Sequence, residues 1–302
     1  MELQRRLNNR ETRIGVSDIG SFASSRSGTR AGESPGTSMV GGPAGFVDND
    51  RMRYRLRAFG MHVLGSAAIL SLVLGTLYVG WYHWPGWYLA RAQDVFLVMV
   101  AVDLVLGPLL TGVIASPAKP RRELVRDVAV IVAVQLAALG YGGVQLWRGR
   151  PLYYAYSENV LQVVQAYDLD PKEADAACAA GLAFCPRWFS MPRWIWAPLP
   201  QDPKIAHEIV DSAIHGGADV VAMPRYFQPW HSGLGALRAQ LKPVDALNYF
   251  SPRQKQTLAA AMRAAGLATE TANAIPLIGR GHPLLAVFDP PTLSLSGFFS
   301  AD

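Results

Sequence analysis

Residues 95–118 read VFLVMVAVDLVLGPLLTGVIASPA, an apolar run that contains one charged residue, Asp103. Residues 58–90 before it contain no Asp, Glu, Lys or Arg, and residues 128–147 after it contain none either. A helix needs about 20 apolar residues to cross a bilayer, and each run supplies them. The sequence therefore predicts a membrane protein with three transmembrane α-helices, followed by a small α+β domain at residues 150–302.

Charge is distributed unevenly along the chain. Over all 302 residues the net charge is +5, but the positive excess lies in residues 1–57 and 58–150. Residues 151–302 carry 11 basic and 13 acidic residues. A protein that binds nucleic acid concentrates basic residues in a patch on its folded domain. We therefore expect no nucleic-acid partner and interpret the basic residues as signals that orient the helices in the lipid bilayer.

These basic residues lie at two places beside the predicted spans. They are Arg51, Arg53, Arg55 and Arg57 before the first span, and Lys119, Arg121 and Arg122 in the short loop between the second and third. Basic loops stay on the cytoplasmic side of a membrane. The loop between the first two spans is instead rich in Trp and Tyr, which favour the membrane–water interface. The N-terminus is therefore predicted to be cytoplasmic and the C-terminal domain extracytoplasmic.

Residues 1–50 precede the membrane unit, which we place at residues 51–149. From residue 15 onward they are rich in Gly, Ser, Thr, Pro and Arg and show no apolar period. Such a segment buries too little apolar surface to fold, which predicts a disordered tail. We favour the interpretation that the tail is an extension of the gene model, because Met52 begins Met-Arg-Tyr-Arg-Leu-Arg, a natural start for a signal anchor. A regulatory tail is the alternative.

Asp103 is the most unusual residue of the predicted spans. It lies near the bilayer midplane, where a charge costs about 2.5–3.5 kcal/mol or more, so we expect it to face the bundle interior. Gln135 of the third span lies at a similar depth, which predicts a hydrogen bond between Gln135 and a protonated Asp103 carboxyl. His62 is expected to lie too near the cytoplasmic end to take part. The alternatives are contact with another membrane helix, a proton relay, or the proton site of a small transporter.

The second run also contains Gly107 and Pro108. Pro108 has no N–H to donate to the carbonyl of Leu104, which predicts a kink. Gly107 and Thr111 are small and four residues apart, a spacing that lets helices approach closely. We expect this face to pack the three spans together or to be left for a foreign helix.

The C-terminal domain shows regular turn and cap signals. Residues 152–157 and 160–167 alternate around Glu158-Asn159, and residues 284–288 and 292–298 flank Asp289-Pro290-Pro291; both patterns predict β-hairpins. Three predicted helices share the same start and stop signals: a capping side chain, a proline at the first helical position and a glycine beyond the end. The pairs of cap and closing glycine are Asp170 and Gly181, Asp202 and Gly216, and Ser251 and Gly266.

Cys178 and Cys185 are the only cysteines in the chain. Because the predicted topology places them outside the cytoplasm, where thiols oxidise, a disulfide is favoured. Two free buried thiols are the alternative. A metal site is not expected, since two further ligands are missing.

His207, Asp211 and His215 stand four residues apart and share one helical face. The run His207-Glu208-Ile209-Val210-Asp211 has Asp where a zinc-protease helix needs its second His. A solvated helix face is the favoured interpretation. The rival interpretation is a membrane-anchored periplasmic enzyme that uses these three side chains. Neither a nucleophile elbow nor a glycine-rich phosphate loop is found, and no cofactor is expected.

Several short pieces, in a fixed order, carry a resemblance to a known family. They are residues 57–62 (RAFGMH), 102–111 (VDLVLGPLLT), 121–124 (RREL), 135–139 (QLAAL), 199–203 (LPQDP), 216–219 (GGAD), 224–227 (PRYF) and 275–280 (IPLIGR). From about residue 52 to its end the chain resembles the TfpX/TfpZ family of type IV pilin accessory proteins. The markers of the resemblance in the outer domain are Gly216, Gly217, Asp219, Pro224, Tyr226, Pro276, Gly279 and Arg280.

The resemblance implies a non-enzymatic role in pilus assembly in the bacterial inner membrane, with the C-terminal domain in the periplasm. The implied partners are the type IV major pilin and the pilus assembly machinery. A pilin awaiting assembly has one apolar helix in the membrane and a globular head outside. We therefore expect Asp103, Gly107, Pro108 and Gln135 to shape a surface for the pilin helix while the outer domain contacts the head. No catalytic residues and no disulfide are carried over from the family.

Overall fold

The computed structural model describes residues 44–116, 118–244, 250–268 and 272–300. Contacts divide the chain into Met1–Ala44 and a compact unit, Gly45–Asp302. Residues 1–43 of the predicted tail lie outside the described residues. Residues 44–50 are already helical, so the first long helix begins earlier than the predicted boundary at residue 51.

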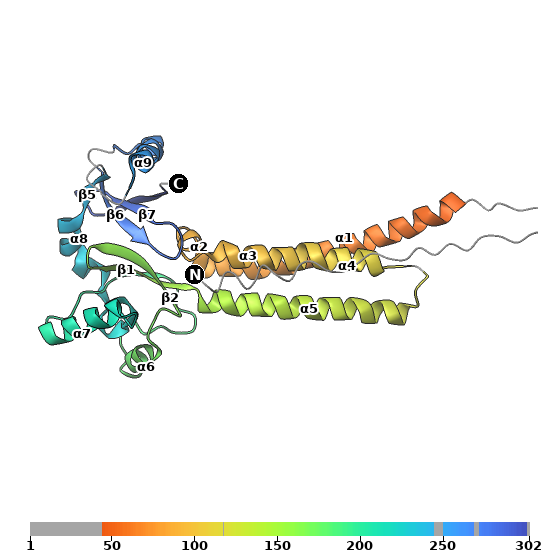
Figure 1. Cartoon of the computed structure of the whole chain (residues 1–302), viewed down its shortest axis with the longest axis horizontal. Helices are drawn as coiled ribbons and strands as arrows, with labels where there is room; N and C mark the ends of the chain where they lie inside the picture. Colours follow the sequence, from red (N-terminus) through yellow and green to blue (C-terminus); the bar gives the residue numbers. More distant parts are fainter. Residues whose placement is uncertain (1–43, 117, 245–249, 269–271, 301–302) are drawn as a thin grey trace, which may run out of the picture. The chain divides into compact units, whose positions relative to one another are not determined.

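Three long helices, each long and apolar enough to cross a membrane, match the three apolar runs (Figure 1). They cover Asn49–Tyr82 (34 residues), Ala92–Ile114 (23 residues) and Arg121–Arg148 (28 residues). The first lies within α1 (Ala44–Leu77) and the π-helix η1 (Tyr78–Tyr82). The second comprises α3 (Ala92–Val100), the π-helix η2 (Ala101–Leu106) and α4 (Gly107–Ile114), and the third is α5 (Arg121–Arg148). The end of the first apolar run leaves the helix and forms a tight connection that contains α2 (Gly86–Leu89).

The half of this bundle next to the C-terminal domain, here called the outer half, is tightly packed. Its core contains Leu70 and Leu77 of α1, Phe96 and Met99 of α3, and Leu146 of α5. The Tyr82 hydroxyl donates to the carbonyl of Leu146 (2.7 Å). A Cβ on Gly142 of α5 would lie 2.6 Å from the sulfur of Met99, so glycine permits this close approach.

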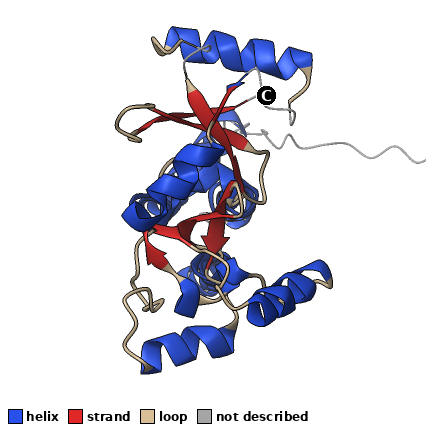
Figure 2. Ribbon diagram, turned by 90° about the vertical axis from the view of Figure 1, so that its left-hand side faces the viewer, coloured by secondary structure: helices blue, strands red, loops and turns tan. Residues whose placement is uncertain are grey.

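The C-terminal domain is a mixed sheet with helices around it. Its strands are β1 (Pro151–Ser157), β2 (Val160–Gln165), β3 (Arg193–Trp196), β4 (Gln228–Pro229), β5 (Lys242–Pro243), β6 (Asn273–Ile278), β7 (Leu284–Phe288) and β8 (Leu295–Ser300). Within the described residues their order is β4-β3-β1-β2-β6-β7-β8, with β5 also paired to β6. Its helices are α6 (Pro171–Ala179), α7 (Pro203–Ile214), α8 (Leu234–Gln240) and α9 (Pro252–Ala264), with short 3-10 turns η3 (Val220–Ala222), η4 (Pro224–Tyr226) and η5 (Trp230–Gly233). Figure 2 shows α9 above the strands and α6 and α7 below them.

Both predicted hairpins and all three predicted helices are present. β1 pairs with β2 around Glu158 and Asn159, whose positive φ angles of 41° and 74° form the tight turn. β7 pairs with β8, although β8 begins at Leu295 rather than at the predicted residue 292. The N-caps are Asp170, Asp202 and Ser251, and the closing residues Gly181, Gly216 and Gly266 all have positive φ.

The parallel pairings of the sheet were not predicted. β3 adds to β1 in parallel, and β6 adds to β2 in parallel, so the two predicted hairpins become one continuous sheet. Pro276 lies where β6 changes partner along one edge, between the residues that pair with β5 and those that pair with β2. A strand tolerates a missing N–H at such a break.

The C-terminal domain is built onto the connection between the first two long helices. Leu89 of α2 is 1% exposed and belongs to the domain's own core, together with Tyr154 and Ile275. The backbone N–H groups of Arg280 and Gly281 both donate to the Leu89 carbonyl, at 2.7 and 3.0 Å. The domain's core therefore includes a residue that precedes it by more than sixty positions in the sequence.

Candidate functional site: a groove between the first and third long helices

The inner half of the bundle is the part on the side of Leu70 away from the C-terminal domain. It contains a cluster of polar side chains. Asp103, Thr111 and Gln135 are all less than 10% exposed, and His62 is half-buried beside them. They come from all three long helices: His62 from α1, Asp103 from η2, Thr111 from α4 and Gln135 from α5. Polar groups in such a position must satisfy one another, because the surroundings are apolar.

His62 is the centre of this polar cluster. Its Nδ1 lies 2.6 Å from the Thr111 hydroxyl and its Nε2 lies 2.7 Å from Gln135 Oε1. Since an amide oxygen only accepts, Nε2 donates to it; a neutral imidazole then accepts the Thr111 hydroxyl proton at Nδ1. The neutral tautomer with the proton on Nε2 therefore satisfies both ring nitrogens. The prediction that His62 takes no part in the polar contacts was wrong. Although His62 lies opposite Thr111 rather than opposite Asp103, its other ring nitrogen reaches Gln135.

Gln135 completes the cluster by supplying a hydrogen bond that the second helix cannot make. In η2 the N–H of Gly107 donates to the Val102 carbonyl, five residues back. The Asp103 carbonyl would then need the N–H of residue 108, which is proline and has none. Gln135 Nε2 donates to this carbonyl instead, at 3.0 Å. The predicted kink-forming proline thus leaves the carbonyl of Asp103 without a partner in its own helix.

Gly107 makes room for the Gln135 side chain. A Cβ on Gly107 would lie 2.0 Å from Gln135 Nε2 and 2.4 Å from its Cδ. The amide is held by two hydrogen bonds and cannot move aside without breaking them. Gly107 therefore permits the close approach of α5 that lets Gln135 donate to the Asp103 carbonyl.

The Asp103 side chain differs from the predicted arrangement. Gln135 contacts its backbone carbonyl, and the carboxyl oxygen Oδ2 is buried with no hydrogen-bond partner among the described residues. The predicted carboxyl–amide bond is therefore absent. Asp103 instead lines a groove in the bundle surface, together with His62, Thr111 and Gln135.

This groove has a volume of 460 Å³ and lies between α1 and α5. One wall is Tyr54, Ala58, Met61, Gly65 and Ile69 of α1, and the other is Leu124, Val128, Val132, Leu136 and Leu139 of α5. Both walls repeat every three or four residues, so each is one face of a helix. Two apolar helix faces thus flank a polar floor, and neither face is covered by the other.

Most marker residues of the C-terminal domain have local structural roles. Gly216 has φ +80° after α7, and a Cβ on Gly217 would lie 2.5 Å from the Ser212 hydroxyl. Asp219 caps η3 by accepting from the N–H of Val220 (2.6 Å). Pro224 is buried at the start of η4, and Tyr226 of η4 lies under the Arg225 guanidinium (5.2 Å). These residues shape turns and loops.

Gly279 and Arg280 instead hold the domain on α2. A Cβ on Gly279 would lie 2.6 Å from the Leu89 carbonyl oxygen, so glycine is needed at this contact. The Arg280 guanidinium lies 4.2 Å above the Tyr167 ring and 3.3 Å from an Asp168 oxygen. The sequence marked Gly279 as part of the resemblance but did not predict its contact with Leu89, because Leu89 is distant in the chain.

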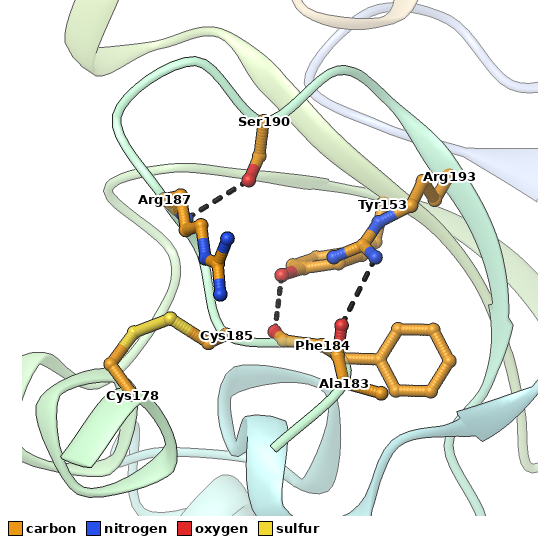
Figure 3. Close-up of a disulfide and its surroundings, with 8 residues drawn as sticks. All are labelled: Tyr153, Cys178, Ala183, Phe184, Cys185, Arg187, Ser190 and Arg193. Carbon is orange, nitrogen blue, oxygen red and sulfur yellow. Dashed lines mark hydrogen bonds between the residues drawn. A yellow bond between two sulfur atoms is a disulfide. The ribbon is translucent and has the colours of Figure 1, made fainter. Parts of the chain in front are cut away.

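Cys178 and Cys185 form a disulfide with a Cα–Cα distance of 4.8 Å (Figure 3). It closes the end of α6 onto the loop that leads to β3. Burial raises the pKa of Tyr153, so its hydroxyl stays protonated and donates to the carbonyl of Phe184 in this loop (2.6 Å).

His207, Asp211 and His215 are exposed on α7 and at its C-cap. His215 Nδ1 lies 2.8 Å from the Asp211 carbonyl and 3.4 Å from its carboxylate. Within the described part of the chain, no group of three His, Cys, Asp or Glu residues is placed to hold a metal ion. This surface gives no observation that favours the enzyme interpretation.

Three proteins of Dichelobacter nodosus are similar to this chain. The fimbrial assembly protein of serogroup I is 25% identical over 237 residues, which is 77% of this chain and 89% of the relative. That of serogroup E1 is 23% identical over the same shares. That of serogroups C1 and C2 is 24% identical over 123 residues, which is 41% of this chain and 94% of the relative. No family model matches the chain, and no solved structure matches it significantly.

Proposed function

We propose that this protein assists assembly of a type IV pilus from the bacterial inner membrane, by holding the apolar helix of a pilin subunit in the groove between α1 and α5. The three long helices cross the membrane with the N-terminus in the cytoplasm, and the C-terminal domain lies in the periplasm. The role is non-enzymatic. The similarity to fimbrial assembly proteins over most of the chain supports the process, and the groove supports the manner.

The observation that carries the proposal is the combination of apolar walls and a polar floor. Two helix faces without a partner suit a third helix, because close packing rather than a hydrophobic drive holds helices together in lipid. The unsatisfied Asp103 carboxyl supplies one specific polar contact. An incoming helix that carries a hydrogen-bond donor or a positive charge at that depth is selected over a purely apolar one.

Photocrosslinking tests the groove directly. A benzophenone amino acid replaces Leu136, which lines the groove and is 53% exposed, or Val134, which is 62% exposed and does not line it. In cells that make pili, the Leu136 position should form an adduct with pilin, and the Val134 position should form much less. Equal adducts at both positions, or none at Leu136 with the protein at its normal level, would contradict the groove as the pilin site.

Gene deletion tests the process independently of the groove. Surface pili should be lost while pilin is still made, and the intact gene should restore them. Unchanged surface pili after deletion would overturn the assembly role altogether.

A further inference from the structure

The loop between α6 and β3 exposes large apolar side chains. In residues 182–191, here called the aromatic loop, Trp188 is 69% exposed, Phe189 is 72% exposed and Met191 is 52% exposed. Three neighbouring side chains of this size are unusual on a surface that faces water. Their position in the domain indicates what covers them.

The aromatic loop is attached to the ends of the first and third long helices. The indole of Trp81, in η1, donates to the Ser190 carbonyl (2.7 Å). The ring of Trp147, in the last turn of α5, lies 5.4 Å from that of Trp188 and 5.7 Å from that of Phe189. Trp81 and Trp147 also contact each other, with ring centroids 5.0 Å apart. The loop therefore lies at the level where both helices leave their apolar segments.

The backbone of the aromatic loop is held by the disulfide and by hydrogen bonds (Figure 3). The disulfide holds its beginning, and Arg193 donates to the Ala183 carbonyl (3.1 Å). The Arg187 N–H donates to the Ser190 hydroxyl (2.9 Å), which closes the turn that carries Trp188 and Phe189. The two rings are thus presented outward by a held backbone instead of folding back onto their own domain.

We propose that Trp188, Phe189 and Met191 insert into the bilayer interface on the side of the C-terminal domain, between lipid headgroups and acyl chains. Aromatic side chains favour this layer, and the loop continues the surface formed by the helix ends. Arg187 of the loop and Arg148, which follows Trp147 in the chain, are both exposed and can each offer a guanidinium to lipid phosphate. This inference rests on the membrane insertion stated in the proposed function, but not on pilin binding.

Spin labels on the full-length protein in lipid nanodiscs test the inference. Phe189→Cys carries the test label. Leu72→Cys in α1 is the lipid reference at 71% exposure, and Ile214→Cys in α7 is the water reference at 75% exposure. The native cysteines are paired and do not react with the label, which the unsubstituted chain verifies. Collision with oxygen reports lipid, and collision with a nickel chelate reports water.

The Phe189 label is expected to resemble the Leu72 label, with high oxygen and low nickel accessibility. Resemblance to the Ile214 label would overturn the inference. Low accessibility to both reagents would also overturn it, since it would mean that a second copy of the chain covers the loop. If the Leu72 label itself reports water, membrane insertion fails, and this result is distinct from failure of the aromatic loop alone.

Discussion

The outer and inner halves of the helix bundle solve the same packing problem in opposite ways. In the outer half, side chains of all three long helices fill one apolar core around Phe96, Met99 and Leu146. In the inner half the helices are joined by the hydrogen bonds of His62 and Gln135, and the apolar faces of α1 and α5 remain open. Packing is complete where the bundle supports the outer domain and incomplete where we propose that a partner binds.

The largest expected difference between the halves is in their glycines. Gly107→Ala should destabilise the protein by about 1–3 kcal/mol, because the new methyl group collides with an amide held by two hydrogen bonds. Gly142→Ala meets Sδ and Cγ of the buried Met99 side chain, which is unbranched and flexible and is not held by hydrogen bonds as the Gln135 amide is, so it should destabilise the protein less than Gly107→Ala. Thermal unfolding of both purified variants in one detergent measures the contrast. Equal shifts in the unfolding temperature would contradict the view that the polar cluster of the inner half is more rigid than the apolar core of the outer half.

Filling the groove should separate function from stability. Val132→Trp places a large ring in the groove, so surface pili should fall severalfold while the amount of protein is kept. Val144→Trp, at an exposed position of α5 that does not line the groove, is the matched control and should leave pili unchanged. Electron microscopy and sheared-pilus quantification provide the readout. Normal piliation with Val132→Trp would show that the open faces have no role in assembly.

Asp103→Leu should reduce surface pili to a smaller extent. The substitution removes a buried carboxyl oxygen without a partner, so the protein should be present at its usual level or be more stable. Asp103→Asn keeps a polar group in the groove and should retain more pili than the leucine variant. The two variants are compared by surface pilin at matched protein amounts. Wild-type piliation with Asp103→Leu would show that the Asp103 carboxyl does not contribute and that any binding in the groove rests on its apolar walls alone.

The smallest effect is expected from the exposed face of α7. Combined His207→Ala and His215→Ala should change the free energy of unfolding by no more than about 0.5 kcal/mol and leave piliation intact, because both side chains are exposed. A strong loss of pili with an intact fold would revive the enzyme interpretation. It would also move the active part of the molecule from the bundle to the outer domain.

Sequence reasoning succeeded where structure is set by near neighbours. Apolar length predicted the three long helices, and caps such as Ser251 with Gly266 predicted the helices of the domain. It failed where the partner is distant in the chain. The period of α1 does not say that His62 meets Thr111, and a lone proline does not say which carbonyl a π-helix leaves free. The spacing of Asp103, Gly107 and Thr111, four residues apart, was the available signal for the cluster.

The position of Leu89 has a consequence for biogenesis. The outer domain includes this residue of the connection between the first two long helices, yet its own chain begins only after the third. A secreted fragment that starts at Arg150 would lack it, and the resulting cavity in the core would cost about 2–5 kcal/mol. In the membrane topology that we propose, the domain reaches its full stability only after the first two helices have been inserted and their connection has reached the side of the membrane where the domain lies. In that topology, complete folding of the domain requires the first two helices to be inserted in the correct orientation.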